Sequence, residues 1–185
     1  IAGMAVGATK GFVYIRSEYP HAFRQVVRAI HVAREAGLLG DDVLGSGQRV
    51  HLEARLGAGA YICGEETSLL ESLEGRRGQI RFKPPLPAIA GLFGRPTVVN
   101  NAISLASVPW ILANGATAYR DYGMGRSRGT MPIQLAGNVR HGGLIERAFG
   151  LTLRELVEDL GGGTATGRPV RAVQVADSAA PAQGR

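Results

Sequence analysis

Residues 57–75, GAGAYICGEETSLLESLEG, join a glycine-rich loop to a helix. Gly57, Gly59 and Gly64 leave no side chains at points where the backbone could approach a flat or phosphorylated ligand. The helix that begins after Gly64 carries three leucines, and it is predicted to present free backbone N–H groups at its first turn. The stretch therefore predicts a ligand-binding loop, although a glycine-rich loop alone is a weak signal.

Two carboxylates, Glu65 and Glu66, fall in the first turn of this helix, where negative charge suits the helix dipole. From their spacing alone, ordinary helix capping is the favoured interpretation. Adjacent carboxylates would repel a pyrophosphate, so this is not the usual kind of phosphate cradle. They could instead accept hydrogen bonds from ribose hydroxyls or a carboxamide. A second, functional interpretation therefore stays open beside capping.

Upstream of the loop, strand and helix signals alternate. A helix is expected over residues 1–8, a short apolar strand over 11–16, and a second helix from Pro20 to Ala36, with Gly37 as its stop. Residues 49–56 alternate apolar and polar side chains, as in a strand with one solvated face. The second helix places apolar residues at spacings of three and four, which predicts a buried stripe. Its members are Phe23, Val26, Val27, Ile30 and Ala33.

Downstream, residues 76–97 form a long loop with the proline-rich run 84–87, which predicts extended backbone. A loop of this length in a compact domain is usually functional. It also holds the four clustered basic residues, Arg76, Arg77, Arg81 and Lys83. These are interpreted first as a solvated loop, and alternatively as a contact with a cofactor phosphate or a partner subunit. Asn100 and Asn101 would then cap a helix running to about residue 114.

The second half of the chain predicts a small β-rich module. Residues 123–130 form a linker or long turn, 133–139 a strand and 142–143 a turn. Thr152 and Glu155 have the spacing of a capping box, the glycines at 161–163 end that helix, and residues 170–175 supply another strand. This order fits a β-grasp-like module over 131–175. Residues 176–185 have no apolar period and are predicted to be disordered.

Composition excludes several classes of site. Among 185 residues there is a single cysteine, Cys63, so this chain alone forms no internal disulfide, multi-thiolate zinc site or iron–sulfur cluster. No metal site is predicted from the four histidines, whose spacing is wrong for ligands. The net charge of +6 suits an anionic partner, but the scattered basic residues and 6% aromatic content argue against nucleic acid. No apolar run is long enough to insert into a membrane, and a reducing cytoplasm is the expected compartment.

Two long motifs, AGAYICGEETSLLESLEG and RPTVVNNAISLASVPWILANG, closely resemble the flavoprotein subunit shared by respiratory complex I, NAD-reducing hydrogenases and NAD-dependent formate dehydrogenases. This resemblance implies FMN and NAD(H) as cofactors. It implies that Tyr61, Gly64, Glu65 and Glu66 lie beside the flavin ring and the nicotinamide. Asn100 and Asn101 would contact the flavin, where their amides offer both donors and acceptors, although plain helix capping is the alternative. No residue is expected to act as a catalytic acid or base, because hydride passes directly between the two cofactors.

The resemblance also implies a fold and a domain order. It predicts an incomplete Rossmann-like flavin-binding α/β domain over 1–122, a linker over 123–130, and a β-grasp domain of the ubiquitin-like SLBB type over 131–175. The segment 124–150 looks most like the formate dehydrogenase branch, whose other subunits and NAD(H) would be the partners, while complex I and hydrogenase are alternatives. The family's upstream flavin loop and downstream cysteines for a four-iron four-sulfur cluster are not in this chain, so we expect the fragment alone to be inactive. A catalytically dead docking module is the rival interpretation.

Overall fold

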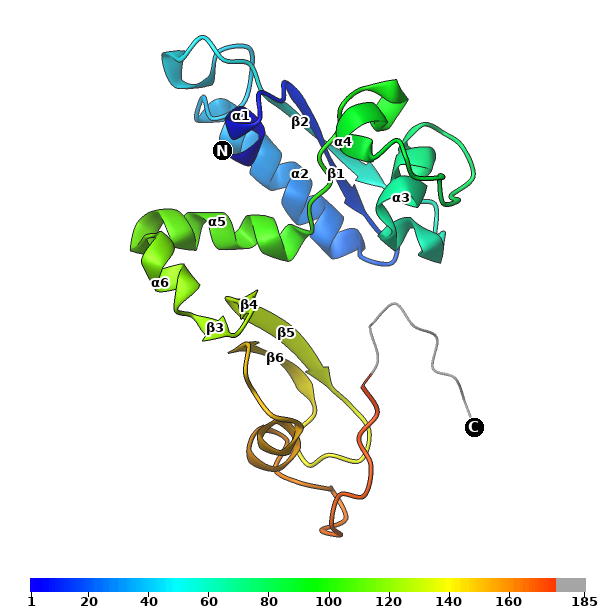
Figure 1. Ribbon diagram of the computed structural model, residues 1–185, viewed down its shortest axis with the longest axis vertical. Coiled ribbons are helices and arrows are strands. Elements are labelled where there is room, and N and C mark those ends of the chain that lie inside the picture. The colour runs from blue at the N-terminus through cyan, green and yellow to red at the C-terminus, as the bar shows by residue number, and fades with distance from the viewer. Residues whose placement is uncertain (176–185) are drawn as a thin grey trace. The chain divides into compact units, whose positions relative to one another are not determined.

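The strand and helix signals at the start of the chain form a β–α–β unit with two parallel strands (Figure 1). The computed structural model describes residues 1–175. Its contacts divide the chain into two units, Ile1–Val99 and Asn100–Arg185, called the first and second unit below. The predicted division into residues 1–122, 123–130 and 131–175 stays a prediction, and the tail predicted to be disordered lies outside the described residues. The elements of the first unit are α1 (Ala2–Ala5), β1 (Lys10–Ile15), α2 (Pro20–Glu35), η1 (Val43–Gly45), β2 (His51–Leu56), η2 (Tyr61–Gly64), α3 (Glu66–Leu73), α4 (Pro87–Ala90) and η3 (Leu92–Gly94).

Strands β1 and β2 pair in register from Lys10 with His51 to Ile15 with Leu56. Helix α2 makes the crossover between them and packs on the sheet (Figure 1). It begins with Pro20 at its first turn and ends before Gly37, whose φ of 69° is a left-handed conformation that glycine adopts without strain. The parallel pairing confirms the α/β class that the sequence predicted.

The predicted buried stripe of α2 is narrower than expected. Ile30 is buried, and Phe23, Val26 and Ala33 are half-buried, but Val27 is 45% exposed. Leu56 at the end of β2 is likewise 51% exposed. A sheet of two strands covers only a narrow part of a helix surface. Residues at the side of the apolar stripe therefore remain exposed to solvent. The prediction for Val27 was therefore wrong.

Helix α3 joins the sheet through side chains rather than through main-chain pairing. The hydroxyl of Tyr14 in β1 lies 2.9 Å from the hydroxyl of Ser72 in α3. A Cβ atom at Gly57 would lie 2.7 Å from the Tyr14 hydroxyl, so only glycine leaves room for this side chain to cross. Burial raises the pKa of Tyr14, whose hydroxyl therefore stays protonated at neutral pH. The glycine at the end of β2 thus serves the packing of α3.

In its described residues, the second unit contains two helices, two small antiparallel pairs and a π-helical segment. Its elements are α5 (Ala102–Asn114), α6 (Ala116–Arg120), β3 (Gly123–Met124), β4 (Ser127–Arg128), β5 (Thr130–Leu135), β6 (Gly143–Ala148) and η4 (Glu155–Leu160). Within the segment 123–130, predicted as a linker or long turn, residues 123–128 form a tight β3–β4 hairpin and Thr130 begins β5. Strands β5 and β6 pair from Thr130 with Ala148 to Leu135 with Gly143. Leu135, Leu156 and Val157 are the buried apolar residues of this unit within the described chain.

Two local predictions for the second unit differ in outcome. The capping box forms, because Glu155 N donates to Thr152 Oγ1 at 3.2 Å and Thr152 N donates to Glu155 Oε2 at 2.8 Å. The predicted strand over residues 170–175 does not form in the described chain. Its residues find no neighbouring strand there, and a strand without main-chain partners has no stabilising ladder. No helix in the described residues is long and apolar enough to cross a bilayer.

Candidate functional site

The parallel pairing brings the carboxyl ends of β1 and β2 to one edge of the sheet, where Arg16 follows β1 and the Tyr61–Glu66 segment follows β2. The guanidinium of Arg16 lies 5.2 Å from the centre of the Tyr61 ring. Ligands of open α/β sheets bind outside the carboxyl ends of the strands. This edge, with Tyr61, Gly64, Glu65 and Glu66, is therefore the candidate site.

Neither the backbone conformation nor the packing of the described chain requires a glycine at position 64. Most glycines of the described residues either have a positive φ or would place a Cβ against a neighbouring atom. Within residues 1–175, Gly64 alone has neither a positive φ nor any atom within 4 Å of the position that a Cβ would take. It is exposed, at the end of η2 and just before α3. The open space above its Cα is where another molecule can approach the backbone closely.

Glu65 is the N-cap of α3. Its Oε2 accepts hydrogen bonds from Thr67 N and Ser68 N, both at 2.9 Å, and from Thr67 Oγ1 at 2.5 Å. The expectation of free N–H groups at this helix start was therefore wrong, because the Glu65 carboxylate already occupies two of them. Burial alone would raise the pKa of Glu65, but the hydrogen bonds from Thr67, Ser68 and Lys83 outweigh it and lower the pKa to about 2.

Glu66 differs from its neighbour. Its Oε1 pairs with Lys83 Nζ at 2.6 Å, and the same Nζ lies 3.3 Å from Glu65 Oε1. The hydrogen bond to Glu66 raises the pKa of Lys83, so this ammonium stays charged. The second oxygen of Glu66 has no hydrogen-bond or ion-pair partner in the described chain, and its side chain is 39% exposed. Glu66 is thus the member of the pair that can accept a hydrogen bond from a ligand, whereas Glu65 is committed to the helix.

Three of the four clustered basic residues are engaged with the protein rather than simply solvated. Arg76, Arg81 and Lys83 all pair with glutamates of the α3 segment, and Arg81 is only 22% exposed. Sequence reasoning named Arg81 but missed its pairing with Glu71 and Glu74. A signal was available in the sequence. The two glutamates are three residues apart, which places both on one face of a helix, and several arginines follow them in the chain.

Cys63 is buried at 4% exposure, and its Sγ contacts the carbonyl oxygen of Ser68 at 3.5 Å. A Cβ at Gly78 would lie 2.8 Å from this sulfur. The thiol therefore fills the space between η2, α3 and the following loop.

Asn100 and Asn101 are the first residues of the second unit. Asn101 caps α5, since its Oδ1 accepts a hydrogen bond from Ile103 N at 2.8 Å. The side chain of Asn100 is exposed and has no hydrogen-bond partner in the described chain. Capping by Asn101 is confirmed, while the convergence of both asparagines with Tyr61, Gly64 and the acidic pair stays a prediction.

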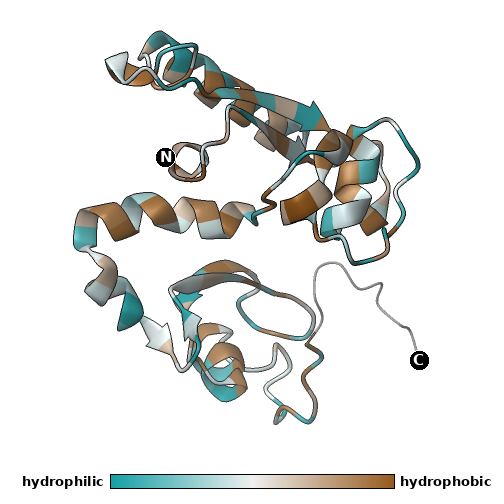
Figure 2. Ribbon diagram, turned by 45° about the horizontal axis from the view of Figure 1, so that its top comes forward, coloured by the Kyte–Doolittle hydropathy of each residue, from teal (hydrophilic) through white to brown (hydrophobic). Residues whose placement is uncertain are grey.

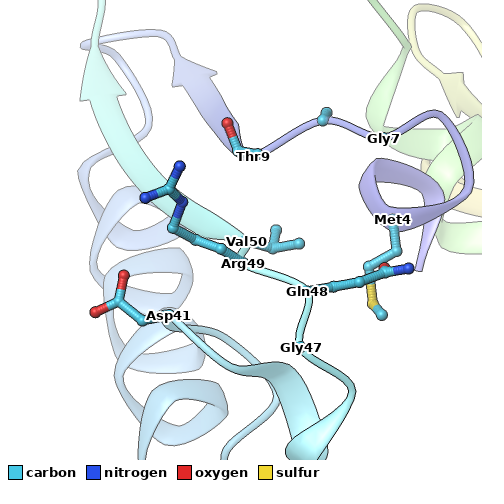
Figure 3. A pocket seen from close by; sticks show the side chains of 9 residues that line it. Met4, Gly7, Thr9, Asp41, Gly47, Gln48, Arg49 and Val50 are labelled. Carbon is cyan, nitrogen blue, oxygen red and sulfur yellow. The ribbon is translucent and has the colours of Figure 1, made fainter.

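A separate hollow of about 700 Å³ lies at the opposite edge of the sheet. Figure 3 shows its lining, which comes from α1, the turn before β1 and the segment leading into β2. Thr9 and Val50 of this lining precede β1 and β2, so the hollow faces the amino ends of the strands. The carboxyl-end edge remains the candidate site, because it combines the open glycine with a partly unpaired carboxylate.

The chain is similar to known proteins over most of its length. Residues 1–110 match the family described as the Nuo51 FMN-binding domain. The HndC component of the NADP-reducing hydrogenase of Solidesulfovibrio fructosivorans is 48% identical over 174 residues, which cover 94% of this chain and 36% of that protein. The F 2 component of the NADH-quinone oxidoreductase of Rhizobium meliloti is 49% identical over 181 residues, covering 98% of this chain and 43% of that protein.

The fold of this chain is also similar to that of a solved structure. A chain of an NAD+-reducing NiFe-hydrogenase, crystallised in the H2-reduced state, matches with a TM-score of 0.76 and 40% sequence identity. The match covers 84% of this chain and 26% of the hydrogenase chain. The chain thus spans less than half the length of the relatives named above. These relatives are subunits of oxidoreductases, and the chain belongs to the Nuo51 FMN-binding domain family.

Proposed function

We propose that this chain is part of the flavoprotein subunit of an NAD-linked oxidoreductase, in which hydride passes between NAD(H) and FMN. The observation that carries the proposal is the open backbone at Gly64, directly before the acidic pair. A flat ring stacked on a backbone needs a position without a side chain. Gly64 supplies such a position, although the packing of the chain itself does not require glycine there. The residues present therefore fit a flavin.

FMN, when bound, supplies the ring that takes up or gives up hydride. This chain's residues have to hold and orient the two cofactors. Gly64 admits the ring, and the free Glu66 oxygen accepts a hydrogen bond from a ribose hydroxyl or a carboxamide of the nucleotide. Tyr61, held beside Arg16, lines the same edge. Glu65 keeps the first turn of α3 in place, and we propose that Asn100 and Asn101 contact the flavin.

The helix start itself is unsuited to a phosphate. Its N–H groups at Thr67 and Ser68 already donate to Glu65, and the acidic pair repels anions. We therefore infer that the phosphate groups of both cofactors bind away from this turn. Relatives are more than twice as long as this chain, so the segments that complete the site would lie outside it.

The finer fold belongs to the same proposal. We expect the β1–α2–β2 unit to be part of a larger Rossmann-like sheet, and the β5–β6 pair with η4 to be part of a β-grasp domain. The likeness to a solved hydrogenase chain over 84% of this sequence supports a shared fold. A structure of the complete subunit tests it, since β1 or β2 would have to gain a further neighbouring strand.

For the assembly, we propose a cytoplasmic NAD-dependent formate dehydrogenase, favoured by the segment 124–150, with complex I and NAD-reducing hydrogenase as the alternatives. Co-purification with the partner subunits, followed by formate-driven reduction of NAD+, tests this choice. Formate-driven reduction selects the first assembly. Reduction driven by hydrogen, or quinone reduction by NADH, selects one of the others.

The flavin proposal is tested with wild-type subunit and a Gly64→Ala variant, by titrating FMN and following the quenching of its fluorescence. We expect the wild type to bind FMN and to support NADH-dependent dye reduction in the assembled subunit, and the variant to lose both. The 185-residue chain alone is expected to bind FMN weakly. Equal FMN binding by both forms would show that the flavin ring does not lie against Gly64 and would contradict the proposal.

A second candidate function, a docking module without catalysis, is favoured by α5. No residue of this helix is buried, and hydrophobic residues occur along its length (Figure 2). Ile103, Leu105, Trp110 and Leu112 are all at least 39% exposed. Retained affinity for a partner subunit with no NADH-dependent dye reduction would select this function instead.

A further inference from the structure

The loop that follows α3 is held against the α3 segment by ion pairs and hydrogen bonds at several positions. We call residues 76–95 the strap. Arg81 Nε pairs with Glu71 Oε1 at 2.5 Å, Arg81 Nη2 lies 2.8 Å from Glu74 Oε1, and Arg81 Nη1 donates to the carbonyl of Gly91 at 3.0 Å. One guanidinium thus holds two glutamates of the α3 segment and a later turn of the strap itself.

This anchor is largely shielded from water. The side chains of Glu71 and Glu74 are each 7% exposed, and that of Arg81 is 22% exposed. The hydrogen bond from Arg81 lowers the pKa of Glu71, and both carboxylates remain charged at neutral pH. A planar fork with several N–H donors can serve three acceptors at once, which the single ammonium of a lysine cannot do with the same geometry. The chemistry of the anchor therefore calls for arginine.

From Arg81 two links run to the acidic pair. The backbone N of Arg81 donates to Thr67 Oγ1 at 3.0 Å, and that hydroxyl donates to Glu65 Oε2 at 2.5 Å. Thr67 is 1% exposed, so this link is shielded from water. Two residues further along the strap, Lys83 bridges Glu65 and Glu66. Phe82, between the two basic residues, is 96% exposed, as expected where successive side chains of an extended segment point to opposite sides.

We propose that Arg81 is a positioning residue for the candidate site: by fixing the strap across α3, it places Lys83 on the acidic pair and so sets the orientation of the Glu66 carboxylate. The consequence for nucleotide binding rests on the proposed function above. The positioning itself does not, because every contact in it lies within this chain. Arg81 touches neither Glu65 nor Glu66 with its side chain, and it acts only through Thr67 and Lys83.

The chain offers a matched control. Arg76 also pairs with Glu71, through Nε at 2.6 Å, but its side chain is 60% exposed and it lies at the start of the strap. Arg81→Lys and Arg76→Lys therefore make the same chemical change on arginines that share a partner. Only the first should loosen the strap at Lys83.

The first measurement needs no cofactor. In the 185-residue chain, the titration of the Lys83 side chain is followed by NMR, together with exchange of the Arg81 amide hydrogen. In Arg81→Lys we expect the Lys83 pKa to fall back toward its ordinary value and the amide to exchange about ten-fold faster. Arg76→Lys should leave both unchanged. An unaltered Lys83 titration in Arg81→Lys would overturn the proposal.

Thr67→Val provides a second variant should Arg81→Lys fail to fold. It removes the hydroxyl that connects the strap to Glu65 while leaving the ion pairs of Arg81 in place. We expect faster exchange of the Arg81 amide and a Lys83 titration that moves in the same direction as in Arg81→Lys. Thr67→Ser, which keeps the hydroxyl, should restore wild-type behaviour, and failure of this rescue would count against the second link.

The second measurement uses the subunit assembled with its partners. Arg81→Lys is expected to raise KM for NADH about three- to ten-fold with little change in kcat, and to leave flavin content intact. If Arg81 acts through Lys83, its effect should largely disappear in a Lys83→Gln background. Fully additive effects would overturn the inference, whereas a wild-type subunit that does not react with NADH would overturn the proposed function and leave the Lys83 titration standing.

Discussion

The guanidinium of Arg16 lies 5.2 Å from the centre of the Tyr61 ring, although the two residues follow different strands. Arg16 also lies 5.6 Å from the centre of the Tyr19 ring and pairs with Glu18 at 2.6 Å. The loops that leave the carboxyl ends of β1 and β2 are therefore joined by a cation–π contact. This contact lies at the edge of the sheet where we propose that the flavin and the nucleotide bind.

Replacing Arg16 tests whether this contact orders the site. In Arg16→Gln the Tyr61 ring loses its cation, and we expect FMN affinity to fall about two- to five-fold while the fold is retained. Fluorescence titration of FMN into the assembled subunit measures the change. Lys10→Gln is the control, because Lys10 Nζ lies 4.9 Å from the centre of the Phe12 ring at the amino end of the same strand. An equal loss in both variants would show that general charge, rather than the Tyr61 contact, is responsible.

Gly64→Ala should separate binding from folding. Because Gly64 has no positive φ and no neighbour near its missing Cβ, alanine fits the chain and should leave thermal stability unchanged or slightly raised. FMN affinity should drop about ten-fold or more, since the added methyl group enters the space proposed for the ring. Gly78→Ala is the matched control, because its Cβ would lie 2.8 Å from Cys63 Sγ and should lower stability. A Gly64→Ala variant that unfolds would instead give this glycine a structural role.

The Glu65 cap predicts a pH dependence of stability. Its pKa is lowered to about 2 in the folded chain, below its ordinary value of about 4.3 when unfolded. A depressed pKa gives stability that is present above the unfolded value and is lost as the pH falls through the folded one. We therefore expect Glu65→Gln to be less stable than the wild type at pH 7, and the difference to shrink between about pH 4.5 and pH 2.

Denaturant unfolding at several pH values measures this difference. Glu71 and Glu74 also have lowered pKa values, so the wild-type curve alone does not isolate Glu65. The comparison with Glu65→Gln does, because the other carboxylates are common to both proteins. A stability difference that stays constant from pH 7 to pH 2 would mean that Glu65 acts through shape rather than through its charge.

The parts of the fold that sequence could predict are those set by neighbouring residues. Asn101 caps α5 and Thr152 forms a capping box with Glu155, and both follow from hydrogen bonds that span two or three positions. The β1–α2–β2 order follows from apolar periodicity in the same way. Sequence predictions of helix caps are reliable here because the capping side chain and the backbone N–H that it binds belong to the same turn of the chain.

What sequence could not predict depends on partners far along the chain. Residues 170–175 have a strand-like composition, but no strand of the described chain pairs with them. Glu65 and Glu66 look alike in sequence, and Glu65 caps α3 through its near neighbours, but the pairing of Glu66 with Lys83, 17 residues further on, is visible only in the structure. The spacing of Glu71 and Glu74 places both on one helix face, but that Arg81 pairs with them is seen only in the folded chain.

Thr152→Ala tests whether the two units unfold separately. The capping box satisfies N–H groups at the start of η4, so its loss should lower the midpoint of the transition that reports on the second unit by about 4–8 °C. Hydrogen exchange should accelerate in residues 130–163 and stay unchanged in α2 and α3. Thr166→Ala, an exposed residue with no side-chain hydrogen bond in the described chain, is the control and should change neither. Faster exchange throughout residues 1–99 in Thr152→Ala would show that the units unfold as one, because damage confined to η4 reaches the first unit only through cooperative unfolding.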